Sequence, residues 1–295
     1  MDFTDLQVFK AVVDEGGISP AAKKLHRVQS NVTTRIQQLE ASLGAKLFVR
    51  KKRRLHLSPA GELFLGYTEQ MLRMSEQARA AVVSHVPRGV LRVGTLESTA
   101  ASRLPSLLSH YHKRYPDVRV ELTTGTTDAL VTAVSTRKLE AAFVADCVST
   151  AFLQTAPAFH EELVLIAPPS HPKIRSAGDV QADTIIAFPS GCAYRRRLQA
   201  WLGVDRIVSE KVLELSSYHA IVACVASGTG IAFVPRSVVA TIKAGRNVSL
   251  HTLPAKIART TTSVVWRKGE SSAALNVLRN EVATLGKGVR AASDR

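Results

Sequence analysis

One stretch of this chain, residues 19–43, constrains its fold more than any other. Its sequence is SPAAKKLHRVQSNVTTRIQQLEASL, which predicts two helices joined by a tight turn. Ser19 is suited to the N-cap of the first helix and Pro20 to its first position, where the missing N–H costs nothing. After a turn at residues 26–28, four aliphatic residues recur at helical spacing: Val32, Ile36, Leu39 and Leu43. This spacing predicts that one face of the second helix is buried.

The opposite face of this second helix carries short polar side chains and one arginine, namely Gln29, Ser30, Asn31, Thr33, Thr34 and Arg35. Asn and Gln pair with adenine edges, Ser and Thr with bases or phosphates, and Arg with guanine or phosphate. We therefore expect this face to contact a DNA groove. A helix face that only contacts water has a similar composition, so the interpretation depends on the neighbouring segments.

A further helix is predicted ahead of these two. Thr4 and Gln7 have the spacing of a capping box at its start, and Gly16-Gly17 is expected to end it. Gly44 is expected to cap the helix that ends at residue 43. Three helices within 43 residues predict a small unit of helix-turn-helix type.

A basic hairpin is predicted directly after these helices. Residues 46–58, KLFVRKKRRLHLS, have strand-like hydrophobic residues on either side of five consecutive cations at 50–54. Cations at such a tip repel one another unless phosphates neutralise them, which favours a DNA-binding wing over a solvated loop. The residues expected to contact DNA here are Arg50, Lys52, Arg53 and Arg54.

A long helix is expected from Ser58-Pro59 to about Ser84. Ser58 is a good N-cap, Pro59 fits the first helical position, and nothing in the following residues breaks a helix. About 26 helical residues span about 39 Å, so this helix needs a partner along its length. Pairing with a second copy of the chain is the simplest solution. The alternative is a helix that lies along the body of its own chain.

The composition limits the class of protein. The 295 residues, 45% of them hydrophobic, suffice for two or three domains, and the net charge of +15 is consistent with an anionic polymer as a partner. Three scattered cysteines argue against a disulfide framework and for a reducing compartment. Because neither a signal peptide nor a run of about 18 apolar residues is found, we expect a soluble, cytoplasmic protein that does not contact a membrane.

After a linker at 87–89, strand-like and helix-like segments alternate. Strands are expected at residues 90–95, 118–122, 141–145, 162–167, 185–188, 212–215, 231–234 and 263–267. Repeated β-α-β units predict a mainly parallel sheet covered by helices. Two such series indicate two α/β lobes, one of about 88–161 and 263–295 and one of about 162–262, with a ligand between them.

Polar side chains follow several of these strands, where the ligands of α/β proteins bind. The predicted ligand contacts are Ser98, Thr99, Thr126, Asp146, Ser190, Cys192, Tyr194, Arg195, Tyr218 and His219. The hydroxyls at 98, 99 and 126 are also typical of ordinary helix caps, and a histidine at such a place is often structural. Asp146 and Glu97 are the acidic groups that a cationic amine would need.

The sequence lacks the motifs of the main enzyme classes. It holds no G-x-S-x-G, H-E-x-x-H, G-x-x-x-x-G-K-[ST] or paired-cysteine metal motif, and its nine histidines are scattered. We therefore expect no catalytic residues, no metal site and no cofactor. A solute-binding protein would explain the C-terminal part but not the N-terminal helices. A purely architectural DNA binder would leave the two lobes without a role.

Essentially the whole chain resembles the LysR-type transcriptional regulators. The resemblance rests on LQVF at 6–9, AAKKL at 21–25, QSNVTTRI at 29–36, LFVR at 47–50, YPDV at 115–118, HP at 171–172 and SGTGI at 227–231. Within that family, HRVQSN at 26–31, LESTA at 96–100, CAYRR at 192–196 and SYH at 217–219 are similar to the putrescine-utilisation regulator subgroup. Thr34 departs from the usual Ser, and Arg137 from the Gly that often precedes the third strand.

The resemblance implies a winged helix-turn-helix DNA-binding domain at 1–58 and a linker helix and hinge at 59–87. It also implies a two-lobed α/β effector-binding domain of the type II periplasmic-binding-protein kind at 88–295. Such a regulator binds double-stranded promoter DNA as a homodimer or homotetramer, with RNA polymerase as a candidate partner. It responds to a small metabolite between the lobes, here an amine, an amino acid or a carboxylate. A redox sensor of the same architecture that uses Cys192 is the alternative.

Overall fold

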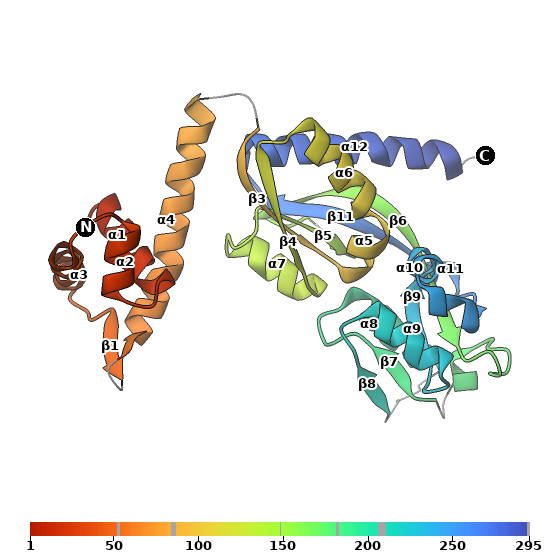
Figure 1. Ribbon diagram of the computed structural model, residues 1–295. Helices are drawn as coiled ribbons and strands as arrows, with labels where there is room; N and C mark the ends of the chain where they lie inside the picture. Colours follow the sequence, from red (N-terminus) through yellow and green to blue (C-terminus); the bar gives the residue numbers. More distant parts are fainter. Residues whose placement is uncertain (52–53, 84–86, 148, 181–182, 206–210, 294–295) are drawn as a thin grey trace. The chain divides into compact units, whose positions relative to one another are not determined.

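The computed structural model describes residues 1–51, 54–83, 87–147, 149–180, 183–205 and 211–293 (Figure 1). The chain divides into two compact units, Met1–His85 and Val86–Arg295. Among the described residues, no helix combines the length and the apolar character needed to cross a membrane. The finer boundaries predicted within the two units stay predictions.

The N-terminal unit packs three short helices against the start of a longer one. Its helices are α1 (Phe3–Asp14), α2 (Ile18–Lys24), α3 (Gln29–Leu43) and α4 (Pro59–Val83), and its antiparallel strands are β1 (Phe48–Lys51) and β2 (Arg54–Leu57). Their apolar faces meet in one core, in which the Phe9 ring lies 5.4 Å from the Phe48 ring and 5.2 Å from the Phe64 ring. The predicted helix-turn-helix with a hairpin wing is confirmed.

The capping box predicted for α1 is wrong. Asp2 is the N-cap, and its carboxylate accepts a hydrogen bond from the Asp5 amide at 2.8 Å. The Asp5 carboxylate accepts one from the Asp2 amide, also at 2.8 Å. Carboxylates at a helix N-terminus interact favourably with the helix dipole, which explains why the aspartates take the place predicted for Thr4 and Gln7.

α2 begins before the predicted position. Its first residue is Ile18, Gly17 is the N-cap residue, and no side chain hydrogen-bonds to this cap, so Ser19 lies inside the helix. The predicted helix ends are confirmed: Gly16 follows α1 with φ of +68°, and Gly44 ends α3 in the left-handed conformation. Both glycines are needed because side chains disfavour positive φ.

The buried face of α3 is shorter than predicted. Val32, Ile36 and Leu39 are buried, whereas Leu43 is 38% exposed. Leu43 is the last helical residue, and the chain leaves the core at the left-handed turn of Gly44. The helical spacing of the sequence therefore located the face but not its end.

A buried carboxylate joins α3 to the hairpin. Glu40 accepts hydrogen bonds from the Leu47 amide at 2.8 Å, the Phe48 amide at 3.2 Å and the Lys46 ammonium at 2.8 Å. Burial alone would raise the pKa of the Glu40 carboxyl, but these donors hold it below its usual range. Glu40 thus fixes the start of the wing relative to α3.

The N-terminus of α4 fits closely against the hairpin. Ser58 Oγ accepts a hydrogen bond from the Gly61 amide at 3.0 Å, which confirms the predicted N-cap, and donates one to the Lys46 carbonyl at 2.5 Å. A Cβ atom on Gly61 would lie 2.1 Å from the Leu47 carbonyl oxygen. Only glycine allows the helix to approach the strand this closely.

We expect Gly61→Ala to destabilise the N-terminal unit by about 1–3 kcal/mol, because the added methyl group overlaps backbone. Gly66→Ala is the control: the same helix leaves its added Cβ with no atom within 4 Å, and helix propensity favours alanine by roughly 0.5–1 kcal/mol. Urea denaturation of the full chain, followed by circular dichroism, measures both. Equal stability of the two variants would contradict the close contact at Leu47.

The C-terminal unit is organised around a seven-stranded sheet with the order β10-β6-β11-β5-β3-β4 and with β9 also paired to β6. The strands are β3 (Gly89–Thr95), β4 (Val118–Thr124), β5 (Ala141–Ala145), β6 (Leu153–Ala167), β9 (Ala232–Pro235), β10 (Ser249–His251) and β11 (Arg259–Arg267). A separate parallel pair is formed by β7 (Ile185–Ala187) and β8 (Val212–Glu214).

The prediction of a mainly parallel sheet is wrong. β3 is parallel to β4 and β5, but β11 is antiparallel to β5 and β6, and β9 and β10 are antiparallel to β6. The cause is β6, a strand of 15 residues that pairs with β11 up to Glu162 and with β9 and β10 from Leu163 onward. β6 and β11 therefore connect two lobes, and the two-lobed α/β architecture is confirmed (Figure 1).

Helices cover both lobes. Lobe I, which contains β3, β4 and β5, has α5 (Glu97–Ser102), α6 (Leu104–Arg114), α7 (Thr127–Ser135) and α12 (Ala273–Ser293). Lobe II, which contains β7 to β10, has α8 (Ala193–Val204), α9 (Tyr218–Ala226), α10 (Arg236–Thr241) and α11 (Ala255–Ala258). Residues of α6 and α12 share one core with the strands of lobe I, whereas residues of α7 share another core with α9 of lobe II. The lobes are thus joined by packed side chains as well as by two strands.

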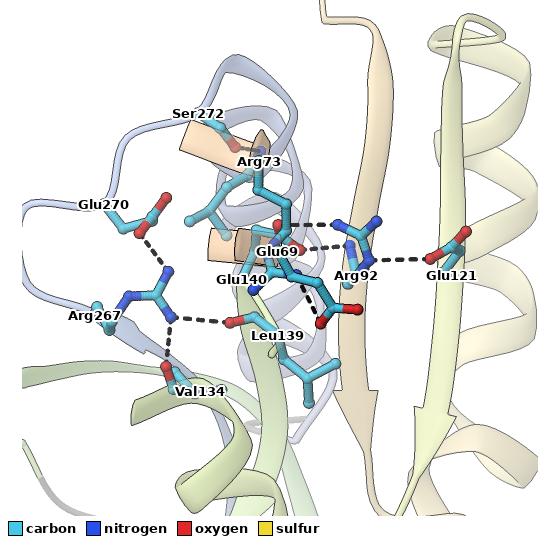
Figure 2. A network of polar contacts seen from close by, with 11 residues as sticks. Glu69, Arg73, Arg92, Glu121, Val134, Leu139, Glu140, Arg267, Glu270 and Ser272 are labelled. Carbon is cyan, nitrogen blue, oxygen red and sulfur yellow. Dashed lines mark hydrogen bonds and ion pairs between the residues drawn. The ribbon is translucent and has the colours of Figure 1, made fainter. Parts of the chain in front are cut away.

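A partly buried arginine fixes the turn between α7 and β5 (Figure 2). The guanidinium of Arg267 donates to the carbonyl oxygens of Val134 and Leu139, the latter at 3.0 Å, and pairs with Glu270. Arg137, within this turn, has φ of +62°. The left-handed conformation costs a residue other than glycine about 1–2 kcal/mol, so the turn keeps the geometry that suits glycine although arginine occupies it.

The same region is linked to the neighbouring strands by Glu140 (Figure 2). Its carboxylate accepts a hydrogen bond from the Arg92 amide at 2.7 Å, and burial raises the pKa of this carboxyl. The Arg92 guanidinium also pairs with Glu121 on β4, with an Nε to Oε2 distance of 3.2 Å. These contacts hold the turn before β5 against β3 and β4.

Candidate DNA-binding surface and effector cavity

α3 presents the residues predicted to contact DNA. Gln29, Ser30, Asn31 and Thr34 are exposed, while Thr33 is partly buried and donates its hydroxyl to the Gln29 carbonyl at 2.9 Å. Within the described part of the chain, no side chain caps the N-terminus of α3. The N–H groups of its first turn are therefore free of a competing side chain, as a phosphate-binding helix end requires.

Arg35 has partners within the protein that the sequence did not reveal. Its Nη1 lies 2.7 Å from Asp5 Oδ1 and 3.4 Å from Asp2 Oδ2, so it pairs with the capping box of α1. These carboxylates raise the pKa of the Arg35 guanidinium. The ion pair gives Arg35 a role in positioning α3 against α1, and its contact with DNA stays a prediction.

The predicted wing residues are described only in part. Arg50 lies on β1 and Arg54 lies on β2, where Lys51 pairs in register with Arg54. Lys52 and Arg53 lie outside the described residues. Both strands of the hairpin that carries the basic block are therefore described.

A small cavity lies between the lobes, beyond the carboxyl ends of three strands. Its lining follows β3 (Leu96, Glu97, Ser98), β4 (Gly125, Thr126) and β7 (Phe188), and includes the starts of α8 (Cys192, Ala193, Tyr194) and α9 (Tyr218). The cavity has a volume of about 10 Å³, roughly the space of one water molecule. This position is where α/β proteins of this kind bind ligands.

The structure brings together half of the predicted ligand contacts: Ser98, Thr126, Cys192, Tyr194 and Tyr218. Sequence reasoning weighed Glu97 without selecting it and missed Leu96, Gly125, Phe188 and Ala193. These four are apolar or glycine, and they are neighbours in sequence of polar residues that were selected. Position directly after a strand was the signal that could have found Leu96, Gly125 and Phe188, whereas Ala193 lies between two residues that were selected.

The other predicted contacts lie outside this cavity. Thr99 is buried in α5, while Ser190 and His219 are exposed. Arg195 Nη1 donates to the Phe188 carbonyl at 3.0 Å and pairs with Glu214. Arg195 therefore holds the Phe188 part of the wall, and His219 acts on the Glu97 carboxyl from outside the lining.

Two adjacent arginines of α8 connect lobe II to lobe I. Arg196 Nη1 lies 3.0 and 3.1 Å from the two carboxylate oxygens of Asp128 on α7. Arg197 makes a bidentate pair with Asp146, at 2.6 and 2.7 Å. Asp146 follows β5 with φ of +56°, and its Oδ1 also accepts a hydrogen bond from Thr260 at 3.0 Å. Asp146 thus binds an arginine of the other lobe and lines a separate, larger cavity.

Glu97 Oε2 is buried beside the interlobe cavity without a hydrogen-bond partner in the described structure. Ser98 Oγ and Tyr194 Oη are buried there too and make no well-formed hydrogen bond, although the Ser98 hydroxyl lies close enough to those of Tyr194 and Tyr218 to oppose the rise in their pKa values that burial causes. The other oxygen of Glu97, Oε1, accepts a hydrogen bond from the Tyr218 amide at 3.4 Å. Burial raises the pKa of the Glu97 carboxyl and of the Tyr194 hydroxyl. The cavity is therefore small and mainly apolar at its surface, with a buried carboxylate oxygen beside it that lacks a hydrogen-bond partner.

Cys192 does not have the surroundings of a reactive thiol. It is buried, and burial raises the pKa of its thiol although Arg195 and Arg196 act in the opposite direction. A raised pKa lowers the fraction of thiolate, which is the species that oxidants attack. The structure therefore does not favour the redox alternative.

We expect Cys192 to react slowly in the folded chain. In a Cys147→Ser/Cys224→Ser variant, its reaction with a disulfide reagent at pH 8 should be at least about tenfold slower without urea than with it, because little exposed thiolate is present. Absorbance of the released thiolate measures both rates. Reaction of the folded chain as fast as that of the unfolded chain would restore the redox hypothesis.

The fold and the two sites define a class of protein, a helix-turn-helix DNA-binding unit joined to a two-lobed α/β ligand-binding unit. Two family models match the chain: "LysR substrate binding domain" over residues 84–286 and "Bacterial regulatory helix-turn-helix protein, lysR family" over residues 3–62. The chain belongs to the LysR family. It is a DNA-binding transcriptional regulator with an effector-binding domain and is not an enzyme.

Relatives cover nearly the whole chain. The HTH-type transcriptional regulator GltR of Bacillus subtilis (strain 168) is 40% identical over 269 residues, which are 91% of each protein. The HTH-type transcriptional regulator YofA of Bacillus velezensis is 37% identical over 268 residues, 90% of this chain and 92% of that one. Neither relative supports the predicted likeness to the putrescine-utilisation subgroup.

Solved structures share the fold. Full-length CbnR, complexed with its target DNA, has a TM-score of 0.71 and 24% identity over 96% of this chain and 99% of that chain. Full-length OxyR from Pseudomonas aeruginosa has a TM-score of 0.71 and 22% identity over 96% of this chain and 94% of that chain.

Proposed function

We propose that this regulator binds promoter DNA as an oligomer and changes transcription when a small metabolite binds between lobes I and II. The observation that carries the proposal is the buried Glu97 Oε2 atom, which has no hydrogen-bond partner in the described structure, beside the poorly paired hydroxyls of Ser98 and Tyr194 around the interlobe cavity. Buried polar atoms in proteins almost always have partners. A ligand that supplies these partners would gain the hydrogen bonds that the free protein lacks.

The closed cavity provides a way for the ligand to change the protein. Typical ligand pockets measure roughly 300–1,000 Å³, far more than the volume of about 10 Å³ found here. A metabolite therefore needs lobes that are further apart, with the contact between Arg196 and Asp128 lengthened or broken. Because the ligand prefers one arrangement of the lobes, binding shifts the population of the two.

On the DNA side, the exposed residues of α3 read the groove and the cations of the wing neutralise phosphates. The proposed contacts are Gln29, Ser30, Asn31, Thr33, Thr34, Arg35, Arg50, Lys52, Arg53 and Arg54. Phosphate contacts supply affinity that depends strongly on salt, whereas contacts with base edges supply specificity. The two groups of residues therefore have separable effects on binding.

The proposed oligomer uses the surface of α4. Leu63, Tyr67 and Met74 recur at helical spacing on α4 and are 67%, 57% and 54% exposed. A second copy of the helix would remove this apolar stripe from water, and two copies would place two recognition helices on one operator. A homodimer or homotetramer acting in the cytoplasm, with RNA polymerase as a further partner, completes the proposal.

Asn31→Ala is expected to weaken binding to the operator by roughly 1–3 kcal/mol, because an amide that pairs with a base edge is lost. Binding to an unrelated duplex should not change. Fluorescence anisotropy with both duplexes at one salt concentration measures the effect. Gln7→Ala, which removes an exposed amide from α1, is the matched control and should bind like the parent. An equal loss on both duplexes would show that Asn31 reads no sequence.

Ser98→Phe is expected to abolish the response to the effector, because the ring fills the interlobe cavity. A metabolite at 100 times its dissociation constant stabilises the parent protein by about 2.7 kcal/mol, which a thermal-shift screen detects. Circular dichroism verifies that the variant is folded. Ser135→Phe, at an exposed position on α7, is the control and should respond like the parent. An undiminished response of the Ser98 variant would place the effector elsewhere.

A further inference from the structure

The residues that line the interlobe cavity include an acidic side chain but no basic one. Of the residues that line it, Glu97 is the one that carries a formal charge, and no lysine, arginine or histidine is among the lining residues. The arginines nearest in sequence are engaged elsewhere: Arg195 with Glu214 and Arg196 with Asp128. His219, outside the lining, acts electrostatically on the Glu97 carboxyl and opposes the rise in its pKa that burial causes. The lining itself therefore offers a ligand one acidic side chain and no basic one.

The Glu97 carboxylate is only half satisfied. Oε1 accepts the hydrogen bond from the Tyr218 amide, whereas Oε2 is fully buried and has no partner in the described structure. A buried carboxylate oxygen requires a hydrogen-bond donor, and a cationic donor satisfies it best because it also neutralises the charge. A positively charged N–H group would supply both the hydrogen bond and the opposite charge.

Aromatic rings and hydroxyl groups complete the wall. The rings of Phe188 and Tyr218 lie 4.6 Å apart at an angle of 46°, and both residues line the cavity. Aromatic faces attract ammonium groups. Ser98 and Tyr194 are each 3% exposed, and their hydroxyls, which make no well-formed hydrogen bond, can bond to a second polar group of the same ligand.

We propose that the effector of this regulator carries an ammonium group, which pairs with Glu97 between the two lobes, next to the rings of Phe188 and Tyr218. The effector is a small amine or amino acid, and a carboxylate without an amine does not bind. This inference rests on the proposed function, since it takes the interlobe cavity as the effector site. Burial that raises the pKa of Glu97 in the free protein would be offset by the bound cation.

The test compares probes with one carbon skeleton and different charges on the full-length protein. Butylamine, 1,4-diaminobutane, 4-aminobutyrate and butyrate form one series, and the corresponding two-, three-, five- and six-carbon compounds and the α-amino acids of the same lengths extend it. Thermal shift identifies binders and calorimetry measures their affinities. We expect every stabilising probe to contain an amine. Stabilisation by carboxylates alone would overturn the inference.

Glu97→Gln tests the role of the charge with the shape of the side chain preserved. We expect it to weaken the binding of an amine probe at least about tenfold, the loss of a charge-assisted contact. Glu121→Gln, a carboxylate of the same lobe outside the cavity, is the control and should bind the probe like the parent. In the absence of a probe, Glu97→Gln should melt at a higher temperature than the parent, because the unpaired charge is gone. A lower melting temperature, or undiminished affinity for amines, would overturn the inference.

Failure of this inference is distinguishable from failure of the proposed function. If the compounds that bind lack an amine and Ser98→Phe abolishes their binding, the cavity is the effector site and only the effector class is wrong. If Ser98→Phe leaves the binding of every stabilising probe unchanged, or no compound in the series or in a wider metabolite screen stabilises the parent, both proposals are wrong.

Discussion

A hydrophobic core that contains residues of both lobes joins them beside the interlobe cavity, and two adjacent arginines of α8 add ion pairs across the same boundary. Arg196 pairs with Asp128 in the first turn of α7, and Arg197 pairs with Asp146, which follows β5. One helix of lobe II therefore contacts two elements of lobe I. Ion pairs that water reaches contribute about 0–1 kcal/mol each. The Arg196 pair is of this kind, since its side chains are 46% and 63% exposed. The Arg197 pair differs, because its side chains are only 20% and 28% exposed and it makes two hydrogen bonds. Of the two contacts, the Arg196 pair is therefore the one that a ligand would break at the smaller cost.

The buried polar atoms around the cavity disfavour the arrangement of the lobes that the arginine contacts favour. In this arrangement, oxygens of Glu97, Ser98 and Tyr194 are buried without well-formed hydrogen bonds. This costs free energy, because water would hydrogen-bond to these atoms if they were exposed. The core shared by α7 and α9, together with β6 and β11, joins the lobes. Under the proposed function, a ligand would exchange the empty arrangement for a filled one with the lobes still joined by these elements.

Sequence reasoning succeeded where the cause of structure is local. The helical spacing in α3, the cations of the wing and the cap at Ser58 each depend on neighbouring residues, and so do the strand ends that located half of the cavity. It failed where the cause lies far along the chain. Asp146 meets Arg197, 51 residues away, and Arg35 meets Asp5, 30 residues away. The sequences of β6 and β11 likewise do not indicate that the two strands pair antiparallel. Nor does the sequence around Glu40 distinguish this buried residue from a surface glutamate.

The most direct test of the account measures the coupling between the two sites in both directions. Operator affinity is measured with and without a saturating effector, and effector affinity is measured with and without saturating operator, on the full-length protein under one set of conditions. If the metabolite acts through the arrangement of the lobes, the two affinity ratios are equal by thermodynamic linkage and differ from one, typically by about 5- to 150-fold. Ratios of one, with both ligands bound at once, would contradict a ligand-controlled regulator.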